Sequence, residues 1–265
     1  NLAGWRLEDG IEFTFPTNAA IPADGYLVVA RNAAWLRPRY ANLDATNTVG
    51  DYSGSLANGG ERIALAMPEV SMATNHNVVR TNVDYVVVDE VEYRDGGRWG
   101  RWSDGGGSSL ELVDPRSDNR LAANWADSDE TGKAPWTTVS VAGVLDNGTV
   151  SADQLQVLLQ GPGECLLDNV EVLTTTGVNL IANSTFEGGI TGWTAEGTEE
   201  PSGLETNEGF NSSRSYHIRA SDRGDNQMNR IRTPLTIAQS AGVTNTIRAK
   251  VRWLRGHPEI LFRLR

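Results

Sequence analysis

The sequence has few of the residues that build covalent cross-links or transition-metal sites. It contains one cysteine, Cys165, which excludes an internal disulfide, a four-cysteine zinc site and CxxC redox chemistry. Its three histidines lie far apart in the sequence and form no metal-binding pair. No apolar run approaches the roughly 18–20 residues that a membrane helix needs. We therefore expect no membrane insertion within this chain.

Basic charge and catalytic motifs are also scarce. The 23 basic residues are outnumbered by 34 acidic ones, for a formal net charge of −11. An acidic chain is poorly suited to nucleic acid, so we expect no nucleic-acid partner. The sequence holds no GxSxG or HExxH motif, no histidine in a triad-like context and no recognisable glycosidase pair of acids. We expect no enzymatic activity.

The sequence is rich in short alternating segments. Residues 155–160 and 246–253 alternate apolar with polar side chains, which is the period of half-buried strands. Turn chemistry separates such segments, and glycine and proline together number 38. One short helix is expected over residues 32–37, ending at Pro38. These patterns predict an all-β protein.

A polar stretch marks a boundary between two domains. Residues 126–133 (ADSDETGK) have almost no apolar side chains and are typical of a linker. We place a first domain at 1–127, a linker at 128–133 and a second domain at 134–265. The chain opens on Asn1 rather than Met, and its last strand-like run, 259–265, stops without a turn. We therefore expect a fragment of a longer protein.

Charge is distributed unevenly within the second domain. Residues 134–213 contain 11 acidic and no basic residues, whereas residues 214–265 contain 11 basic and three acidic ones. Adjacent segments of opposite charge favour packing on each other. This distribution indicates one domain built from both segments.

The first domain contains a series of short motifs: 1–7 (NLAGWRL), 13–16 (FTFP), 22–29 (PADGYLVV), 55–61 (SLANGGE), 88–93 (VDEVEY) and 107–112 (GSSLEL). In their type and order these motifs resemble the lamin-tail domain found in bacterial surface proteins, over about residues 1–125. This resemblance implies an immunoglobulin-like β-sandwich. From the residues themselves we expect a core of Trp5, Leu7, Tyr26, Val28, Ile63, Leu65, Val91, Tyr93, Leu110 and Leu112. The family's opening strand is missing here, which predicts an exposed sheet edge.

The second domain contains residues 179–189 (NLIANSTFEGG), followed by Gly192-Trp193, and then 215–219 (SYHIR). These segments resemble the opening and the next strand of galactose-binding-like jelly rolls, the β-sandwich of many carbohydrate-binding modules. Segments resembling the family's closing strands stand upstream instead: 136–139 (WTTV), 155–160 (LQVLLQ) and 166–172 (LLDNVEV). Residues 134–173 are either the tail of a separate jelly roll or part of one circularly permuted jelly roll. Charge complementarity and the linker favour permutation.

The jelly-roll resemblance implies a structural calcium ion held by Asp168 and Glu187. Alternation places Asp168 on one face with Leu166, Val170 and Val172, where a carboxylate must be hydrogen-bonded, paired or bound to a metal. Carboxylate oxygens suit Ca²⁺. The alternative is that Asp168 only accepts hydrogen bonds from the backbone or an arginine.

Two groups of residues are candidates for ligand binding. Trp99 and Trp102 could form a sugar-stacking platform, or could belong to a hairpin loop folded over the end of the sandwich. Arg248, Lys250 and Arg252 share one strand face, which could bind an acidic polysaccharide or could be a solvated face offset by the acidic segment. Arg219, Arg230, Arg232, Arg263 and Arg265 are expected on neighbouring strands.

These observations predict a non-catalytic accessory, adhesion or spacer region of a secreted or cell-surface bacterial protein, with polysaccharide or cell-surface glycan as its possible partner. The first alternative is a true carbohydrate-binding module attached to an enzyme encoded outside this fragment. The second is a catalytic domain, which would need a cleft with converging acids of perturbed pKa. An exposed aromatic pair on a sheet face would favour the binding module.

Overall fold

The protein is an all-β sandwich protein, as the alternation predicts. A computed structural model describes residues 1–75, 78–146, 148–225 and 227–265. Strands account for 47% and helices for 5% of the structure. The α-helix α1 spans Ala33–Leu36, and the Asn32 side chain caps it by accepting a 2.8 Å hydrogen bond from the Trp35 amide. Within the described ranges, no helix combines the length and the apolar character that crossing a membrane requires.

The chain divides into two compact units. The first comprises Asn1–Gly100 and Glu111–Ala126, and the second comprises Arg101–Leu110 and Asp127–Arg265. Loop 101–110 thus belongs with the later part of the chain. The Trp102 and Ser103 amides donate to the Asp127 carboxylate over 3.1 and 2.7 Å, and the Gly256 amide donates to the Gly106 carbonyl over 2.8 Å.

The first unit is built on a five-stranded antiparallel sheet. Its strand order is β5 (Ser53–Gly54), β2 (Ile11–Thr14), β1 (Arg6–Asp9), β6 (Gly60–Asn75) and β7 (Val78–Arg94). A parallel pair, β3 (Val28–Ala30) and β4 (Thr48–Gly50), accompanies it, and the small core is centred on Leu2, Phe15 and Ala19. The 3₁₀ turn η1 (Arg37–Arg39) follows α1 and contains Pro38.

The expected positions of Tyr26 and Val28 are wrong. Leu27 and Val29 pack against the core, whereas the Tyr26 side chain is 77% exposed. A shift of one residue in a strand exchanges its two faces, so the error lies in the phase of the alternation.

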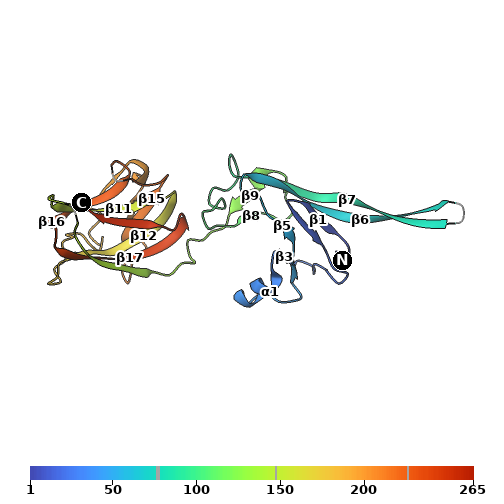
Figure 1. Cartoon of the computed structure of the whole chain (residues 1–265), viewed down its shortest axis with the longest axis horizontal. Helices are drawn as coiled ribbons and strands as arrows, with labels where there is room; N and C mark the ends of the chain where they lie inside the picture. Colours follow the sequence, from blue (N-terminus) through green and yellow to red (C-terminus); the bar gives the residue numbers. More distant parts are fainter. Residues whose placement is uncertain (76–77, 147, 226) are drawn as a thin grey trace. The chain divides into compact units, whose positions relative to one another are not determined.

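A long two-stranded ribbon leaves the sheet of the first unit (Figure 1). Strand β1 pairs with β6 as far as Ala66, and beyond that point β6 pairs only with β7. The lamin-tail resemblance of this unit stays a prediction.

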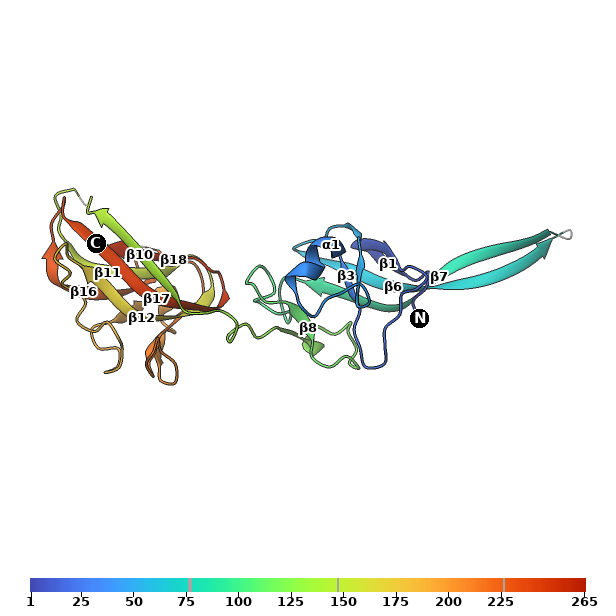
Figure 2. The same cartoon turned by 90° about the horizontal axis from the view of Figure 1, so that it is seen from below.

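The second unit is a sandwich of two antiparallel sheets (Figure 2). One sheet has the order β10 (Thr137–Val144), β17 (Thr244–Gly256), β12 (Gly163–Leu173), β15 (Ser215–Ala220) and β14 (Gly203–Glu205). The other has the order β13 (Thr194–Glu196), β16 (Arg230–Gln239), β11 (Ala152–Leu159) and β18 (Ile260–Leu264). Strands β8 (Leu110–Leu112) and β9 (Trp125–Asp127) form a separate pair, most of which belongs to the first unit. The 3₁₀ turn η2 (Ala122–Asn124) also belongs to the first unit, and η3 (Gly197–Glu199) belongs to the second.

The upstream strands of the second unit pair with downstream ones. Strand β10 pairs with β17, β12 lies between β15 and β17, and β11 lies between β16 and β18. Residues 134–173 and 179–265 therefore share both sheets, which confirms the pairing expected of one permuted jelly roll.

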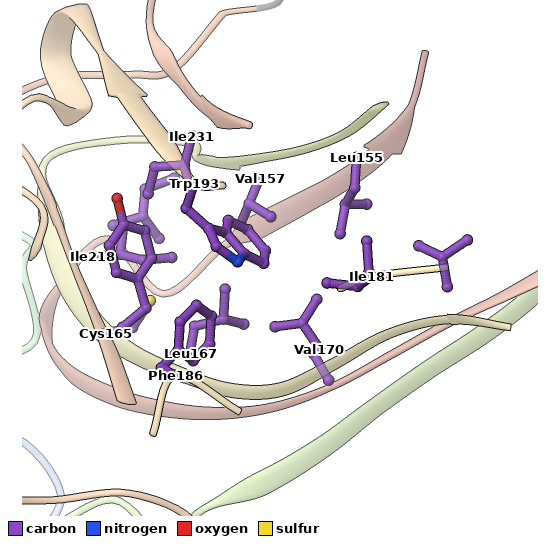
Figure 3. Close-up of a cluster of buried hydrophobic side chains, with 14 of the residues drawn as sticks. Leu155, Val157, Cys165, Leu167, Val170, Ile181, Phe186, Trp193, Ile218 and Ile231 are labelled. Carbon is purple, nitrogen blue, oxygen red and sulfur yellow. The ribbon is translucent and has the colours of Figure 1, made fainter. Parts of the chain in front are cut away.

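The core of the second unit lies between its sheets (Figure 3). Leu155 and Val157 of β11 face inward, as their alternation predicts. Phe186 stacks on Tyr216 with ring centroids 5.5 Å apart, and Trp193 lies 5.2 Å from Phe186. Trp193 and Tyr216 are thus core residues.

Candidate functional site

The outer face of the five-stranded sheet carries the basic residues predicted on β17. Ala249 is buried in the core, so Arg248 and Lys250 point to the opposite face. The antiparallel register places Thr138 of β10 opposite Lys250 and Glu171 of β12 opposite Arg248. On this face the Lys250 ammonium therefore has a hydroxyl group as its cross-strand neighbour, and the Arg248 guanidinium has a carboxylate.

A groove of about 480 Å³ lies on this face, and we call it the β17 groove. Its lining comprises Thr138, Asn169, Glu171, Ser184, Thr185, Arg248, Ala249 and Lys250. The Arg248 Nε donates to Glu171 Oε2 over 2.5 Å, and the Lys250 Nζ donates to Thr138 Oγ1 over 2.5 Å. Hydroxyl, amide and charged groups thus converge in one shallow space, where they can hydrogen-bond to a polyhydroxylated ligand.

Two aromatic rings adjoin the groove. The Lys250 ammonium lies 4.1 Å from the centroid of the Phe210 ring. Phe210 and Trp136 meet edge to face, with centroids 6.1 Å apart. Both side chains are half-buried. The two rings are not the exposed pair expected on a sheet face, because they are half-buried and do not line the groove. The sequence did not single them out.

Arg252 lies on the same face but is engaged by the protein. It forms an ion pair with Glu208 and donates from Nε to the Ala134 carbonyl over 2.9 Å. Its role is therefore to hold the loop before Phe210 and the segment before Trp136 on the sheet.

A bulge changes the predicted surroundings of Asp168. The pairing of β12 with β17 shifts between Asp168 and Glu171, and Asn169 adopts a φ of +46°. Val170 and Val172 consequently point into the core, whereas Asp168 lies opposite Lys250 on the other face. The predicted common face of Asp168 with Val170 and Val172 is wrong, because alternation assumes an unbroken strand.

Asp168 and Glu187 bind the loop that carries Phe210. Asp168 Oδ2 accepts from the Phe210 amide over 2.8 Å and from the Ser212 hydroxyl over 3.1 Å, and Oδ1 accepts from the Asn169 amide over 2.7 Å. Glu187 accepts from the Arg214 amide over 3.0 Å and from a serine hydroxyl over 3.2 Å. Burial raises the pKa of Asp168, and the charge on Glu187 adds to the rise.

The two carboxylates fit a calcium site poorly. A calcium ion takes six to eight oxygens, and these oxygens already accept hydrogen bonds from the loop. No group of three or more acidic, histidine or cysteine side chains that could hold a metal occurs within the described ranges. The calcium site stays a prediction, and we derive no step from it.

A second polar cluster lies on the same sheet. Glu164 on β12 accepts from His217 Nε2 over 2.9 Å and from an Arg255 guanidinium nitrogen over 2.7 Å. Arg219 donates to His217 Nδ1 over 2.8 Å. Burial alone would raise the pKa of Glu164, but the hydrogen bonds from His217 and Arg255 hold it at about 2. The cluster is mutually bonded and serves to join β12, β15 and β17.

The two tryptophans predicted as a platform belong to different compact units. Trp99 lies in the first unit, where it packs on Trp125 with centroids 6.1 Å apart. Trp102 lies in the second unit, where the Arg255 guanidinium is 5.3 Å from its ring centroid. The sugar-stacking platform that would combine them stays a prediction.

Converging acids of perturbed pKa are not found in the β17 groove, as far as the described residues show. The acid with the most raised pKa is Glu199, which is fully buried and accepts from the Leu159 amide over 2.9 Å. Burial raises its pKa to about 7. It does not line the groove.

Comparisons with known proteins bear on the second unit. Residues 178–261 match the model of a family described as a carbohydrate binding domain. The match starts beside the Asn179-Leu180 opening on which the jelly-roll resemblance rests. Neither the curated proteins nor the solved structures that were compared gave a match to this chain. The family match supports a carbohydrate-binding module.

Proposed function

We propose that the second unit is a non-catalytic carbohydrate-binding module whose ligand lies in the β17 groove. The family match over residues 178–261 carries this proposal. The groove supports it, because its hydroxyl, amide and charged groups suit sugar hydroxyls, and the half-buried ring of Phe210 lies beside Lys250, which lines the groove.

Within this proposal the chain is an accessory region of a secreted or cell-surface protein. A binding module of this kind serves equally as an adhesion element and as the part that brings an attached enzyme to its polysaccharide. The first unit, which we propose to be lamin-tail-like, would act as a spacer.

Affinity electrophoresis of the full chain through gels containing neutral soluble polysaccharides tests the proposal. We expect retardation by at least one neutral polymer and about tenfold weaker binding for Lys250→Gln, since a hydrogen bond to a charged group contributes about 1.5–3 kcal/mol. Arg223→Gln is the matched control, because Arg223 is an exposed cation outside the groove.

Absence of retardation by every polymer, with the protein shown to be folded, would contradict a carbohydrate-binding role. Equal weakening by Lys250→Gln and Arg223→Gln would reject the β17 groove as the site.

A further inference from the structure

The outer face of the four-stranded sheet carries a continuous polar row on the other side of the sandwich. The pairings place Thr194 opposite Arg232, Arg232 opposite Gln156, and Gln156 opposite Arg263. Leu155 and Val157 are in the core, so Gln156 and its cross-strand neighbours point outward. We call Arg232, Gln156 and Arg263 the arginine row.

Gln156 has an unusual environment for a residue on an outer face. It is fully buried, and among the described residues neither its amide nitrogen nor its amide oxygen has a hydrogen-bond partner. The Oε1 atom of Gln154, the next outward residue on β11, likewise has no partner within the described chain. Burying an amide without a partner destabilises the folded state, so a packing role would be better served by an apolar side chain.

The row has an excess of positive charge. Glu196 accepts from Arg232 Nε over 2.8 Å and pairs with Arg230 over 3.2 Å, so one carboxylate serves two guanidinium groups. Arg263 lies on the opposite flank of Gln156. On the five-stranded sheet, by contrast, Arg248 pairs with Glu171 and Arg252 with Glu208.

We propose that the arginine row binds a carboxylate-bearing sugar of an acidic polysaccharide. Neighbouring strands are about 4.8 Å apart, and β11 lies between β16 and β18. The backbones at Arg232 and Arg263 are therefore separated by roughly 10 Å, which leaves room for one sugar ring between the two side chains. Guanidinium groups bind carboxylates through paired hydrogen bonds. Both polar atoms of the Gln156 amide are buried, so this donor and acceptor reach sugar hydroxyls only when the ligand displaces the side chains that cover them.

This inference rests on the proposed carbohydrate-binding function but adds a second site with a different ligand class. The β17 groove combines both charge signs with hydroxyl groups and an aromatic pair, which suits neutral sugars. The arginine row combines excess positive charge with an unpartnered amide, which suits uronate sugars. The two sheets would then bind two chemically different polysaccharide chains.

The test uses the full chain with polygalacturonate as the acidic probe and neutral polysaccharides in parallel. We expect Arg263→Gln to weaken polygalacturonate binding about tenfold and to leave neutral binding unchanged. Polygalacturonate binding should also weaken as ionic strength rises. Lys133→Gln, which removes one exposed positive charge from the segment before β10, should change neither binding.

Gln156→Met separates a ligand-binding amide from a structural one. We expect weaker polygalacturonate binding together with an unchanged or raised melting midpoint, since the substitution removes a buried amide that lacks a partner. A lowered midpoint would show that solvent or protein satisfies the amide, and would overturn the proposal. So would polygalacturonate binding that neither Arg263→Gln nor Gln156→Met alters.

The two arms distinguish the possible failures. Binding of a neutral polymer without polygalacturonate binding would reject the arginine row and retain the carbohydrate-binding function. Failure to bind either class of polymer would reject both.

Discussion

Strands β11 and β12 are inner strands of opposite sheets, and they differ in how fully their buried polar groups are hydrogen-bonded. On β12, Glu164 and Asp168 accept hydrogen bonds on both carboxylate oxygens. On β11, Gln156 has no partner among the described residues, and Glu199, which binds the end of this strand, has a partner for only one oxygen within the same set. The buried carboxylates of β12 therefore stabilise the sandwich by bonding neighbouring strands and loops. The buried Gln156 amide and the Glu199 oxygen beside β11 destabilise the folded state, because they lack partners among the described residues.

This difference follows from how charge is distributed along the chain. Strand β12 is acidic and lies beside β15 and β17, which come from the basic segment, so its carboxylates meet His217, Arg255 and Arg248 across the strands. Strand β11 lies between β16 and β18, which are also basic, but it presents glutamines to them. An uncharged amide leaves the neighbouring arginines without a neutralising partner on this strand.

The largest expected effect is on the pH dependence of stability, and it comes from Glu199 beside β11. Its pKa is about 7 in the folded protein against an ordinary 4.5, so the folded state retains its proton while the unfolded chain loses it. Stability should fall by up to about 3 kcal/mol as pH rises from about 4.5 through 7. Urea unfolding at pH 5 and pH 8 measures this fall, and Glu199→Gln should flatten it. An unchanged pH dependence in the variant would contradict the assignment.

A smaller effect of opposite sign is expected at Glu164 on β12. Its pKa of about 2 lies below the ordinary value, so its stabilising contribution is present above about pH 4.5 and is lost as pH falls toward 2. Glu164→Gln should lower the free energy of unfolding at pH 6 by about 2 kcal/mol, because it leaves His217 and Arg255 without their carboxylate. Glu259→Gln is the control, since that side chain is 73% exposed. An equal loss of unfolding free energy in both variants would show that the Glu164 cluster stabilises the fold no more than an exposed carboxylate does.

The smallest effect sharpens the contrast between the two outer faces. Glu196→Gln removes the carboxylate shared by Arg230 and Arg232, and should strengthen polygalacturonate binding about two- to threefold at low salt. Stability should change by less than about 1 kcal/mol, as for other partly exposed ion pairs. Glu171→Gln makes the same charge change on the five-stranded sheet, where it releases Arg248. An equal gain from both variants would assign the effect to overall charge instead of the arginine row.

Periodicity and local chemistry were sufficient to predict most of the second unit. Alternation identified β11 and β17 and the inward residues Leu155 and Ala249, because both strands have one apolar face. Opposite charges on the two segments predicted that they share one sandwich, and the pairs Glu171–Arg248 and Glu164–Arg255 now link those segments.

The remaining features depend on tertiary structure that no local pattern records. The bulge at Asn169 turns Asp168 away from Val170, and alternation has no signal for it. Trp136 and Phe210 stand in irregular segments, so only the loop anchored by Asp168 brings them to the groove. The arginines predicted as one surface separate onto two faces, because β16 and β18 belong to a different sheet from β17.

The strand order of the second unit also sets the sequence of events during synthesis. Strands β10, β11 and β12 are made first, but none of them pairs with another of the three. Thr137 of β10 pairs with Val251, which is synthesised 114 residues later (251 minus 137). Gln156 of β11 pairs with Arg232, which is also synthesised later. Long loops must close before these contacts form, which slows folding. In the nascent chain β12 should therefore stay unpaired until β15 emerges, β11 until β16 and β10 until β17, and the second unit should fold late and slowly.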